Sequence, residues 1–180
     1  MAFRVIVEDG SIFAIASLRR AADTPVARSS AKGSLLRELQ CMLEQEITAV
    51  SFSHLPEETW AAATAAPWCL GMDAAHDSEF GPDFPLGKVF HPRELATGHP
   101  PAALWAMKEA VVKARGCGFD GLNPLDITLR PDLGLAWICD RENPPFHIWS
   151  RRQEGNIWIA VVYASFEKKE NRSLCGNKTR

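Results

Sequence analysis

The side chains best suited to chemistry in this sequence are two acids and one lysine, namely Asp73, Glu109 and Lys113. Glu109 and Lys113 are four residues apart in a segment with helical periodicity, which puts both on one face of a helix. Asp73 follows the apolar run 68–72 and therefore ends an expected strand. Magnesium binds one or two carboxylates together with substrate phosphates, and a nearby lysine can neutralise phosphate oxygens. This set suits phosphoryl transfer from a polyphosphate.

Each of these residues also has a simpler interpretation. Glu109 and Lys113 could form an exposed ion pair worth about 0.3–0.5 kcal/mol. Asp73 could merely begin the loop that follows it. The chemical interpretation therefore depends on one structural prediction, which is that Asp73 and Glu109 lie close enough to share a cation.

A helix over residues 101–115 must position Glu109 and Lys113. Proline at its first position and Gly116 just past its end match the usual preferences of helix termini. One side of this helix is an apolar stripe, which predicts that it packs on a core. The stripe consists of Leu104, Met107, Val111 and Ala114.

The rest of the chain alternates between short strands, a further helix and turn-forming loops. Gly10 occupies the turn of a predicted hairpin, and Ser29 or Ser30 can cap a helix that runs to about Glu46. Helices and strands are mixed without a regular βαβ order, which indicates the α+β class. The strands are expected at 3–7, 12–16, 47–53, 127–130, 135–139, 146–150 and 157–164, with 59–66 and 68–72 as a possible second hairpin, loops at 18–27 and 77–87, and a brief helix near His91.

Composition narrows the function classes. The chain has 180 residues, of which 46% are hydrophobic, so it can bury a core as one domain or two small halves. It contains no apolar run long enough for a membrane helix and no signal-peptide pattern. A net charge of −2 speaks against a nucleic-acid binder. The five cysteines form no CxxC pair, which indicates reduced thiols in a cytoplasmic protein rather than a zinc site or a disulfide framework.

Four sequence blocks, in this order, resemble the 4′-phosphopantetheinyl transferase family. The most specific block is Trp-Ala-Met-Lys-Glu-Ala-Val-Val-Lys at residues 105–113, which matches the family pattern Trp-x-x-Lys-Glu-(Ala/Ser)-x-x-Lys. The resemblance covers about residues 28–166. The position of Asp73, far from the start of the chain, is similar to that in the larger surfactin-type members. The other blocks are Ser-Phe-Ser-His at 51–54, Gly-Met-Asp at 71–73 and the segment 88–94, which ends in glutamate.

The resemblance implies an α+β fold of two similar halves, a pseudo-dimer with small antiparallel sheets packed on helices. It implies transfer of the 4′-phosphopantetheine group of coenzyme A to a carrier-protein serine, with Mg²⁺ and release of adenosine 3′,5′-bisphosphate. Asp73 and Glu109 would be the metal ligands. Glu109 would also activate the serine, and Lys113 would neutralise the pyrophosphate. The coenzyme A-binding residues implied are Arg28, Ser53, His54, Asp73, Lys108 and Lys113.

One position departs from the family pattern. The family commonly has glutamate two residues after the aspartate, where this chain has Ala75. Water could fill the missing position, or Asp77 or Glu79 could reach it. Alternatively, the protein could be a weakened or inactive member that binds coenzyme A or a carrier protein without transfer. A structural protein with an incidental motif match would instead hold Asp73 and Glu109 far apart.

The resemblance also predicts the organisation and the partners. Residues 1–70 would form a short N-terminal half, residues 71–166 a C-terminal half with the site motifs, and residues 167–180 a disordered tail. The expected partners are coenzyme A and an acyl or peptidyl carrier protein, with a monomeric enzyme and neither nucleic acid nor membrane. A basic surface could attract an acidic carrier, or it could be a solvated charged face; it would consist of Arg19, Arg20 and Arg37.

Overall fold

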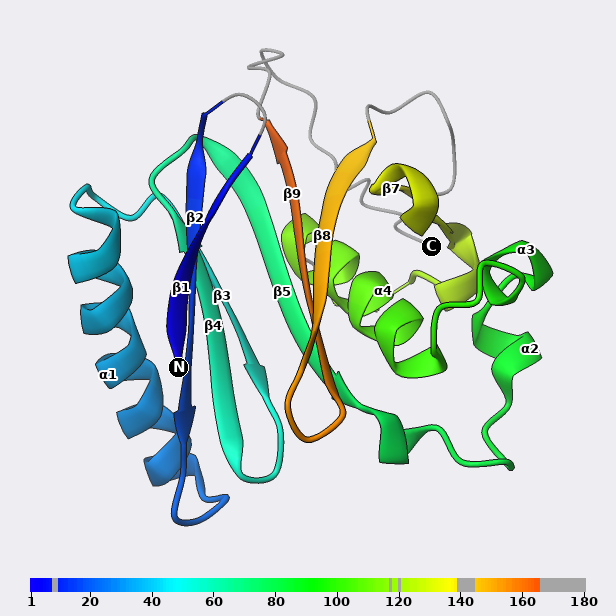
Figure 1. Cartoon of the computed structure of the whole chain (residues 1–180), viewed down its shortest axis with the longest axis horizontal. Coiled ribbons are helices and arrows are strands. Elements are labelled where there is room, and N and C mark those ends of the chain that lie inside the picture. Colours follow the sequence, from blue (N-terminus) through cyan, green and yellow to red (C-terminus); the bar gives the residue numbers. More distant parts are fainter. Residues whose placement is uncertain (8–9, 117, 120, 139–144, 166–180) are drawn as a thin grey trace, which may run out of the picture.

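Two antiparallel sheets lie face to face, and each carries one long helix on its outer side, as the computed structural model shows (Figure 1). The structure describes residues 1–7, 10–116, 118–119, 121–138 and 145–165. The expected α+β class is thereby confirmed. No helix in these ranges is both long and apolar enough to cross a bilayer.

The first sheet has the strand order β1-β2-β4-β3 and is built from the N-terminal part of the chain. Helix α1 (Pro25–Leu43) covers its outer face. Alanines of β2 and β4 face this helix, and their small side chains let it approach closely. The strands are β1 (Ala2–Ile6), β2 (Ile12–Arg19), β3 (Ala49–His54) and β4 (Glu58–Thr64).

The second sheet has the order β5-β9-β8-β7-β6. Helix α4 (Pro101–Arg115) packs on its outer face, and short helical turns fill the connections. The strands are β5 (Trp68–His76), β6 (Ile127–Arg130), β7 (Leu135–Ile138), β8 (Phe146–Gln153) and β9 (Ile157–Ser165). The turns are η1 (Asp77–Glu79), α2 (Leu86–Val89), α3 (Pro92–Leu95), η2 (Pro124–Asp126) and η3 (Pro131–Leu133).

A shared apolar core joins the two sheets. Phe13 and Trp60 of the first sheet pack with Met72 and Val161 of the second, and all four are at most 2% exposed. The core therefore belongs to both sheets, because neither of them buries its inner face alone.

Serine hydroxyls join the sheets where β3 runs beside β5. Met72 N donates to Ser51 Oγ at 2.9 Å, and Ala74 N donates to Ser53 Oγ at 3.1 Å. These bonds satisfy backbone donors at the edge of β5, which would otherwise be buried without a partner. They also fix the end of β3 against the second half of β5. Asp73 lies inside this strand and not at its end as expected, because β5 continues to His76.

Helix α4 lies unusually close to β5 because of Gly71. A Cβ atom at this position would overlap the α4 backbone at Ala110 and Ala114. The helix begins at Pro101 and ends at Gly116, which adopts a left-handed conformation with φ 78°, as the sequence predicts.

Most predicted elements are confirmed, and several expected boundaries and pairings need correction. Helix α1 begins at Pro25 instead of Ser29 or Ser30, because Thr24 caps it by accepting a hydrogen bond from Ala27 N at 3.2 Å. Residues 68–72 do not form a hairpin with β4; they belong to β5, which pairs with β9. The loop expected from residue 18 starts later, since β2 continues to Arg19. The predicted boundary at residue 70 falls inside β5, and the predicted tail at 167–180 lies outside the described residues.

Candidate functional site

A cleft of about 970 Å³ opens where the ends of β3 and β5 meet α4. Its volume is within the range of about 300–1,000 Å³ that is typical of ligand sites. The turn between β3 and β4, η1 and the turn between β8 and β9 complete the walls. Five of the predicted site residues line it, namely Ser53, His54, Asp73, Glu109 and Lys113, whereas Arg28 and Lys108 do not.

Asp73 lies on the floor of this cleft and is only 2% exposed. Its Oδ1 accepts hydrogen bonds from Ser53 Oγ at 2.8 Å and from Lys113 Nζ at 2.6 Å. Its Oδ2 is buried and has no hydrogen-bond partner. The two donors therefore fix the orientation of the carboxylate and leave one oxygen for a ligand. Ser53, which also accepts from Ala74 N, acts here as the group that positions Asp73.

Glu109 on α4 meets the Asp73 carboxylate. Burial raises the pKa of Glu109 to about 8, and the negative charge of Asp73 raises it further, against the opposing charge of Lys113. Two carboxylates this close cannot both be ionised without a proton or a cation between them. Asp73 and Glu109 thus face one cleft, whereas an incidental motif match would have held them far apart.

Lys113 joins three elements at the site. Besides its bond to Asp73, its ammonium group donates to the carbonyl oxygen of Phe52 on β3 at 3.0 Å. An ammonium group has three donors, so these two bonds leave one for a ligand in the cleft. The simple i,i+4 pair with Glu109 is not the arrangement found, because Lys113 forms its ion pair with Asp73.

His54 lies at the rim of the cleft among positively charged groups. Its Nδ1 is 3.1 Å from Thr59 Oγ1 and 3.4 Å from Arg20 Nη1. Burial lowers the pKa of His54, and the charges of Lys32 and Arg20, then of Arg28 and Lys113, lower it further. Since Arg20 is always a donor, its contact assigns the proton of the neutral ring to Nε2. This region attracts anions.

The sequence analysis missed Lys32 and misplaced Arg20. Lys32 follows Arg28 by four residues on α1, a spacing that puts both on one face and could have revealed it. Lys32 Nζ lies 5.3 Å from the centre of the Phe52 ring. Arg20 is not part of a basic surface, because its side chain is 2% exposed and pairs with Asp23 at 2.7 Å. It also donates to the carbonyls of Leu55 and Pro56, which fixes the turn after His54.

Arg28 is exposed, and its guanidinium group binds Asp23 instead of facing the cleft. It forms two bonds to Asp23, at 2.8 and 2.7 Å. Its charge reaches His54, but its guanidinium group does not line the cleft.

Lys108 is completely buried and serves the edge of the second sheet. Its Nζ donates to Pro124 O at 2.8 Å, to Ile127 O at 2.8 Å and to Glu94 Oε2 at 2.9 Å. Glu94 Oε1 in turn accepts from Leu129 N at 2.8 Å. The ion pair thus provides hydrogen-bond partners for backbone groups of β6, namely Ile127 O and Leu129 N, at the edge of the sheet. All three ammonium donors are used, so none remains for a phosphate.

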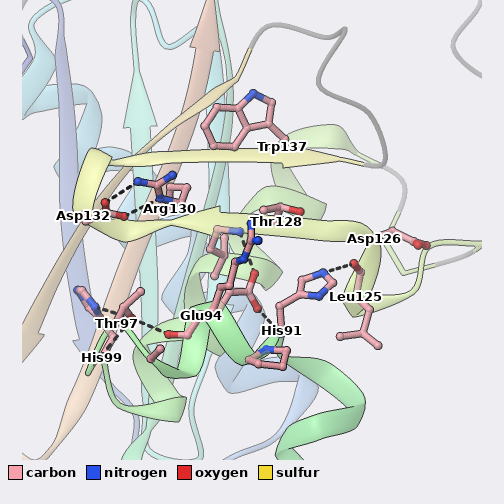
Figure 2. A pocket seen from close by; sticks show the side chains of 14 residues that line it. His91, Glu94, Thr97, His99, Leu125, Asp126, Thr128, Arg130, Asp132 and Trp137 are labelled. Carbon is pink, nitrogen blue, oxygen red and sulfur yellow. Dashed lines mark hydrogen bonds and ion pairs between the residues drawn. The ribbon is translucent and has the colours of Figure 1, made fainter.

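Figure 2 shows Glu94 in the wall of a second cavity, of about 1140 Å³, between α3 and β6. The polar groups here mostly bind one another, as in the ion pair of Arg130 and Asp132 at 2.9 Å and the contact of His91 Nε2 with Leu125 O at 2.7 Å. This cavity is the larger of the two, and each of its described acids has another partner: Glu94 pairs with Lys108, Asp132 pairs with Arg130, and Asp126 accepts from Asn123 N.

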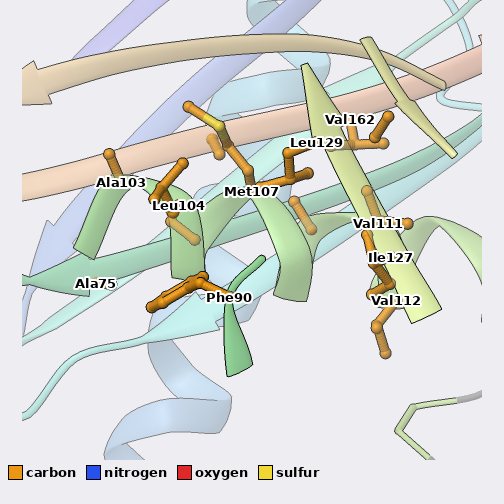
Figure 3. Close-up of a cluster of buried hydrophobic side chains, with 14 of the residues drawn as sticks. Ala75, Phe90, Ala103, Leu104, Met107, Val111, Val112, Ile127, Leu129 and Val162 are labelled. Carbon is orange, nitrogen blue, oxygen red and sulfur yellow. The ribbon is translucent and has the colours of Figure 1, made fainter. Parts of the chain in front are cut away.

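Ala75 is 1% exposed and packs into the core beneath α4, as Figure 3 shows. It pairs across the sheet with Trp158, which packs against the same cluster. Ala75 itself does not line the cleft, and apolar side chains of the core surround its methyl group.

The donor set fits a magnesium ion that keeps water or substrate oxygens among its ligands. Asp73 offers a buried, unpartnered oxygen beside the Glu109 carboxylate, and Mg²⁺ commonly uses only one or two protein carboxylates. Within the described ranges, no group of three or more His, Cys, Asp or Glu side chains is arranged to hold a metal.

Comparison with known protein families supports this picture. Residues 69–162, more than half of the chain, match the 4′-phosphopantetheinyl transferase superfamily, and this region contains Asp73, Glu109 and Lys113. No curated protein matches the chain. From this match, the chain belongs to the 4′-phosphopantetheinyl transferase superfamily.

Proposed function

We propose that this protein transfers the 4′-phosphopantetheine group of coenzyme A to a serine of an acyl or peptidyl carrier protein, with Mg²⁺. Its superfamily makes it a phosphopantetheinyl transferase-type enzyme. The observation that carries the finer proposal is the carboxylate pair of Asp73 and Glu109, which shares one cleft with Lys113.

Each group at the cleft floor has a role in this proposal. Asp73 and Glu109 would hold the cation, and the cation would supply positive charge against the pyrophosphate. The serine oxygen forms a bond to the phosphorus that carries the pantetheine arm. The bond from that phosphorus to the bridging oxygen breaks, and adenosine 3′,5′-bisphosphate leaves. Glu109 takes the serine proton, directly or through water, and Lys113 stabilises the charge on the leaving group.

The basic rim of the cleft supports binding of the other coenzyme A phosphate. We assign this contact to His54, which lines the cleft and offers Nε2–H, and Lys32 adds positive charge near it without lining the cleft. Arg28 contributes charge from outside the cleft. Lys108 is left out of the proposed binding site because its three donors are used within the protein.

We also propose that one chain is sufficient for catalysis, as two unequal halves that meet at the start of β5. The support for this is that β3 of the first sheet and β5 of the second both contribute to the cleft. A complete site within one chain requires no second copy.

A second candidate function is coenzyme A or carrier-protein binding without transfer. The observation that favours it is Ala75, whose position lacks the acid that the family commonly has. Calorimetry separates the two candidates, because a binding module would take up coenzyme A equally well without Mg²⁺ and with Glu109→Ala.

The test of transfer is incubation of the whole protein with coenzyme A, Mg²⁺ and a panel of apo carrier proteins. Intact-mass measurement should show the addition of one phosphopantetheine to a carrier serine. Asp73→Asn and Glu109→Gln should each slow transfer by at least about 100-fold, the scale expected for general acid–base catalysis alone. Asp132→Asn, in the second cavity, is the matched control and should leave the rate unchanged. Equal rates in all variants would contradict the proposed site.

A further inference from the structure

Arg20 is a buried cation directly after the end of β2. Its side chain is 2% exposed, whereas that of the preceding Arg19 is 78% exposed. A buried guanidinium group lowers stability unless several acceptors surround it. The acceptors that surround Arg20 belong to two different segments, and both of them lie near the cleft.

The first set of contacts lies in the turn between β3 and β4. Arg20 Nη2 donates to the carbonyl oxygens of Leu55 and Pro56, and Arg20 Nη1 donates to Thr59 Oγ1 at 3.1 Å. His54 lies just before this turn, and its Nδ1 is 3.1 Å from the same Thr59 hydroxyl and 3.4 Å from Arg20 Nη1. Arg20 thus holds both the turn and the ring of His54.

These contacts determine which nitrogen of His54 carries the proton. Since the Thr59 hydroxyl oxygen accepts from Arg20, its own hydrogen is available to Nδ1, and Arg20 can only donate. Nδ1 is therefore an acceptor, and the neutral ring has its proton on Nε2. His54 lines the cleft, so Nε2–H is the ring donor that remains for a ligand there.

The second set of contacts joins Arg20 to the start of α1. Arg20 Nη2 pairs with Asp23 Oδ1 at 2.7 Å, and the same carboxylate accepts two bonds from Arg28, at 2.8 and 2.7 Å. Thr24, which caps α1, directly follows Asp23. The end of β2, the start of α1 and the turn between β3 and β4 lie at the same end of the first sheet (Figure 1). One buried arginine therefore ties these three segments together.

We propose that Arg20 is a positioning residue for recognition of the 3′-phosphate of coenzyme A, because it presents Nε2–H of His54 to the cleft and ties the start of α1 to the strand end that carries His54. This proposal rests on the proposed function, since it concerns the same nucleotide. The 3′-phosphate is separate from the pyrophosphate that faces Lys113. Arg20 itself is too buried to touch this phosphate, so it acts through His54.

The test compares coenzyme A with 3′-dephospho-coenzyme A, which lacks only the phosphate in question. Calorimetry gives the dissociation constant of each ligand for the whole protein with Mg²⁺, and the ratio of the two constants measures recognition of that phosphate. We expect the parent protein to prefer coenzyme A. Arg20→Gln should reduce this preference about 10-fold, the scale of one lost hydrogen bond to a charged group. A merely structural role would weaken binding of both ligands equally, and an unchanged ratio would overturn the proposal.

Thr59→Val decides the question if Arg20→Gln does not fold. Valine is similar in shape to threonine and lacks only the hydroxyl group that joins Arg20 to His54, so the bonds of Arg20 to Leu55 and Pro56 remain. This variant should also reduce the preference for coenzyme A. Nitrogen NMR of the His54 ring should show Nε2–H in the parent and a mixture of the two neutral forms in the variant. A ratio and a ring spectrum like those of the parent would contradict the proposed role of Arg20.

Two further arginine variants test whether charge alone explains the effect. Arg19→Gln is the matched control, because Arg19 lines the cleft, carries the same charge and pairs with Glu57 at 2.7 Å. It should leave the ratio unchanged, and an equal reduction would show a general charge effect and overturn the proposal. Arg20→Lys keeps the charge without the fork of donors, so it should retain only part of the preference. Full retention in Arg20→Lys would also show that charge alone is sufficient.

His54→Ala separates this proposal from the proposed function. If His54→Ala abolishes the preference for coenzyme A while Arg20→Gln and Thr59→Val both keep it, the role of Arg20 is wrong and the phosphate contact assigned to His54 stands. If His54→Ala keeps the preference, that contact in the proposed function is itself wrong, and the role of Arg20 fails with it.

Discussion

Binding of a proton and binding of a cation compete at Asp73 and Glu109, because the two carboxylates share a largely buried space. Burial and the neighbouring carboxylate raise the pKa of Glu109 from its ordinary value of 4.5 to about 8. Without a cation, Glu109 therefore keeps its proton at neutral pH. A divalent cation competes with that proton, since metal ligands must be deprotonated.

This coupling gives the metal-free protein a defined pH dependence. Between about pH 4.5 and pH 8 the folded state holds a proton on Glu109 that the unfolded state has lost. Stability therefore falls as pH rises through this interval and levels off above it. We expect the free energy of unfolding to fall by about 1–3 kcal/mol. One pKa unit corresponds to about 1.4 kcal/mol, and the shift is shared between Glu109 and Asp73, so only part of it counts here.

Urea unfolding in the presence of EDTA, at several pH values, checks this expectation. Glu109→Gln has no proton to lose at this position and should flatten the dependence. Magnesium affinity should rise with pH over the same interval. A stability that increases from pH 5 to pH 8, or a slope that Glu109→Gln leaves intact, would contradict the assignment.

At the scale of elements, the distance between Asp73 and Glu109 depends on how closely α4 lies on β5. Gly71 sets this distance, since a Cβ atom there would overlap the α4 backbone at Ala110 and Ala114. Backbone cannot move aside as a flexible side chain can, so a larger residue at position 71 must displace the helix.

We therefore expect Gly71→Ala to destabilise the protein by at least about 1–3 kcal/mol, the usual cost of overpacking. The displaced helix should also separate Glu109 from Asp73 and weaken Mg²⁺ binding. Gly87→Ala on α2 is the matched control, because a Cβ atom there meets nothing within 4 Å. Urea unfolding and Mg²⁺ titration measure the two effects. Equal behaviour of the two variants would show that α4 does not depend on close approach at Gly71.

At the scale of the whole molecule, the cleft exists because two sheets share one core. Met72 lies at the centre of that core, is 0% exposed and belongs to β5 beside Asp73. The first sheet depends on this contact as much as the second does. The two halves should consequently unfold together.

Met72→Ala tests this cooperativity. We expect one unfolding transition for the parent and for the variant, with the variant less stable by about 2–5 kcal/mol, as for other large-to-small core changes. Leu133→Ala, at a position 57% exposed, is the control and should change stability little. Calorimetry measures both. Two separate transitions, only one of them shifted by Met72→Ala, would mean that the halves fold independently.

Local patterns were sufficient to predict the elements that carry the site. The apolar stripe and termini of 101–115 predicted α4, because helix signals depend on nearby residues. Four ordered motifs predicted the superfamily, and with it the meeting of Asp73 and Glu109. The same kind of local reasoning placed the start of α1 too late, since Thr24 and Ser29 are both acceptable caps.

Long-range packing decided the rest. Lys108 binds Glu94 and the carbonyl oxygens of Pro124 and Ile127 at the edge of β6. These groups are far from Lys108 in the sequence, so no rule of residue spacing could predict that they meet. That Arg20 is buried depends on the turn after His54. The partner of β5 is β9, and strand pairing between distant segments is set by the shared core rather than by either segment alone. Residue types and spacing indicate which groups can do chemistry, whereas the unpartnered oxygen of Asp73 and the burial of Ala75 in the core exist only in the packed molecule.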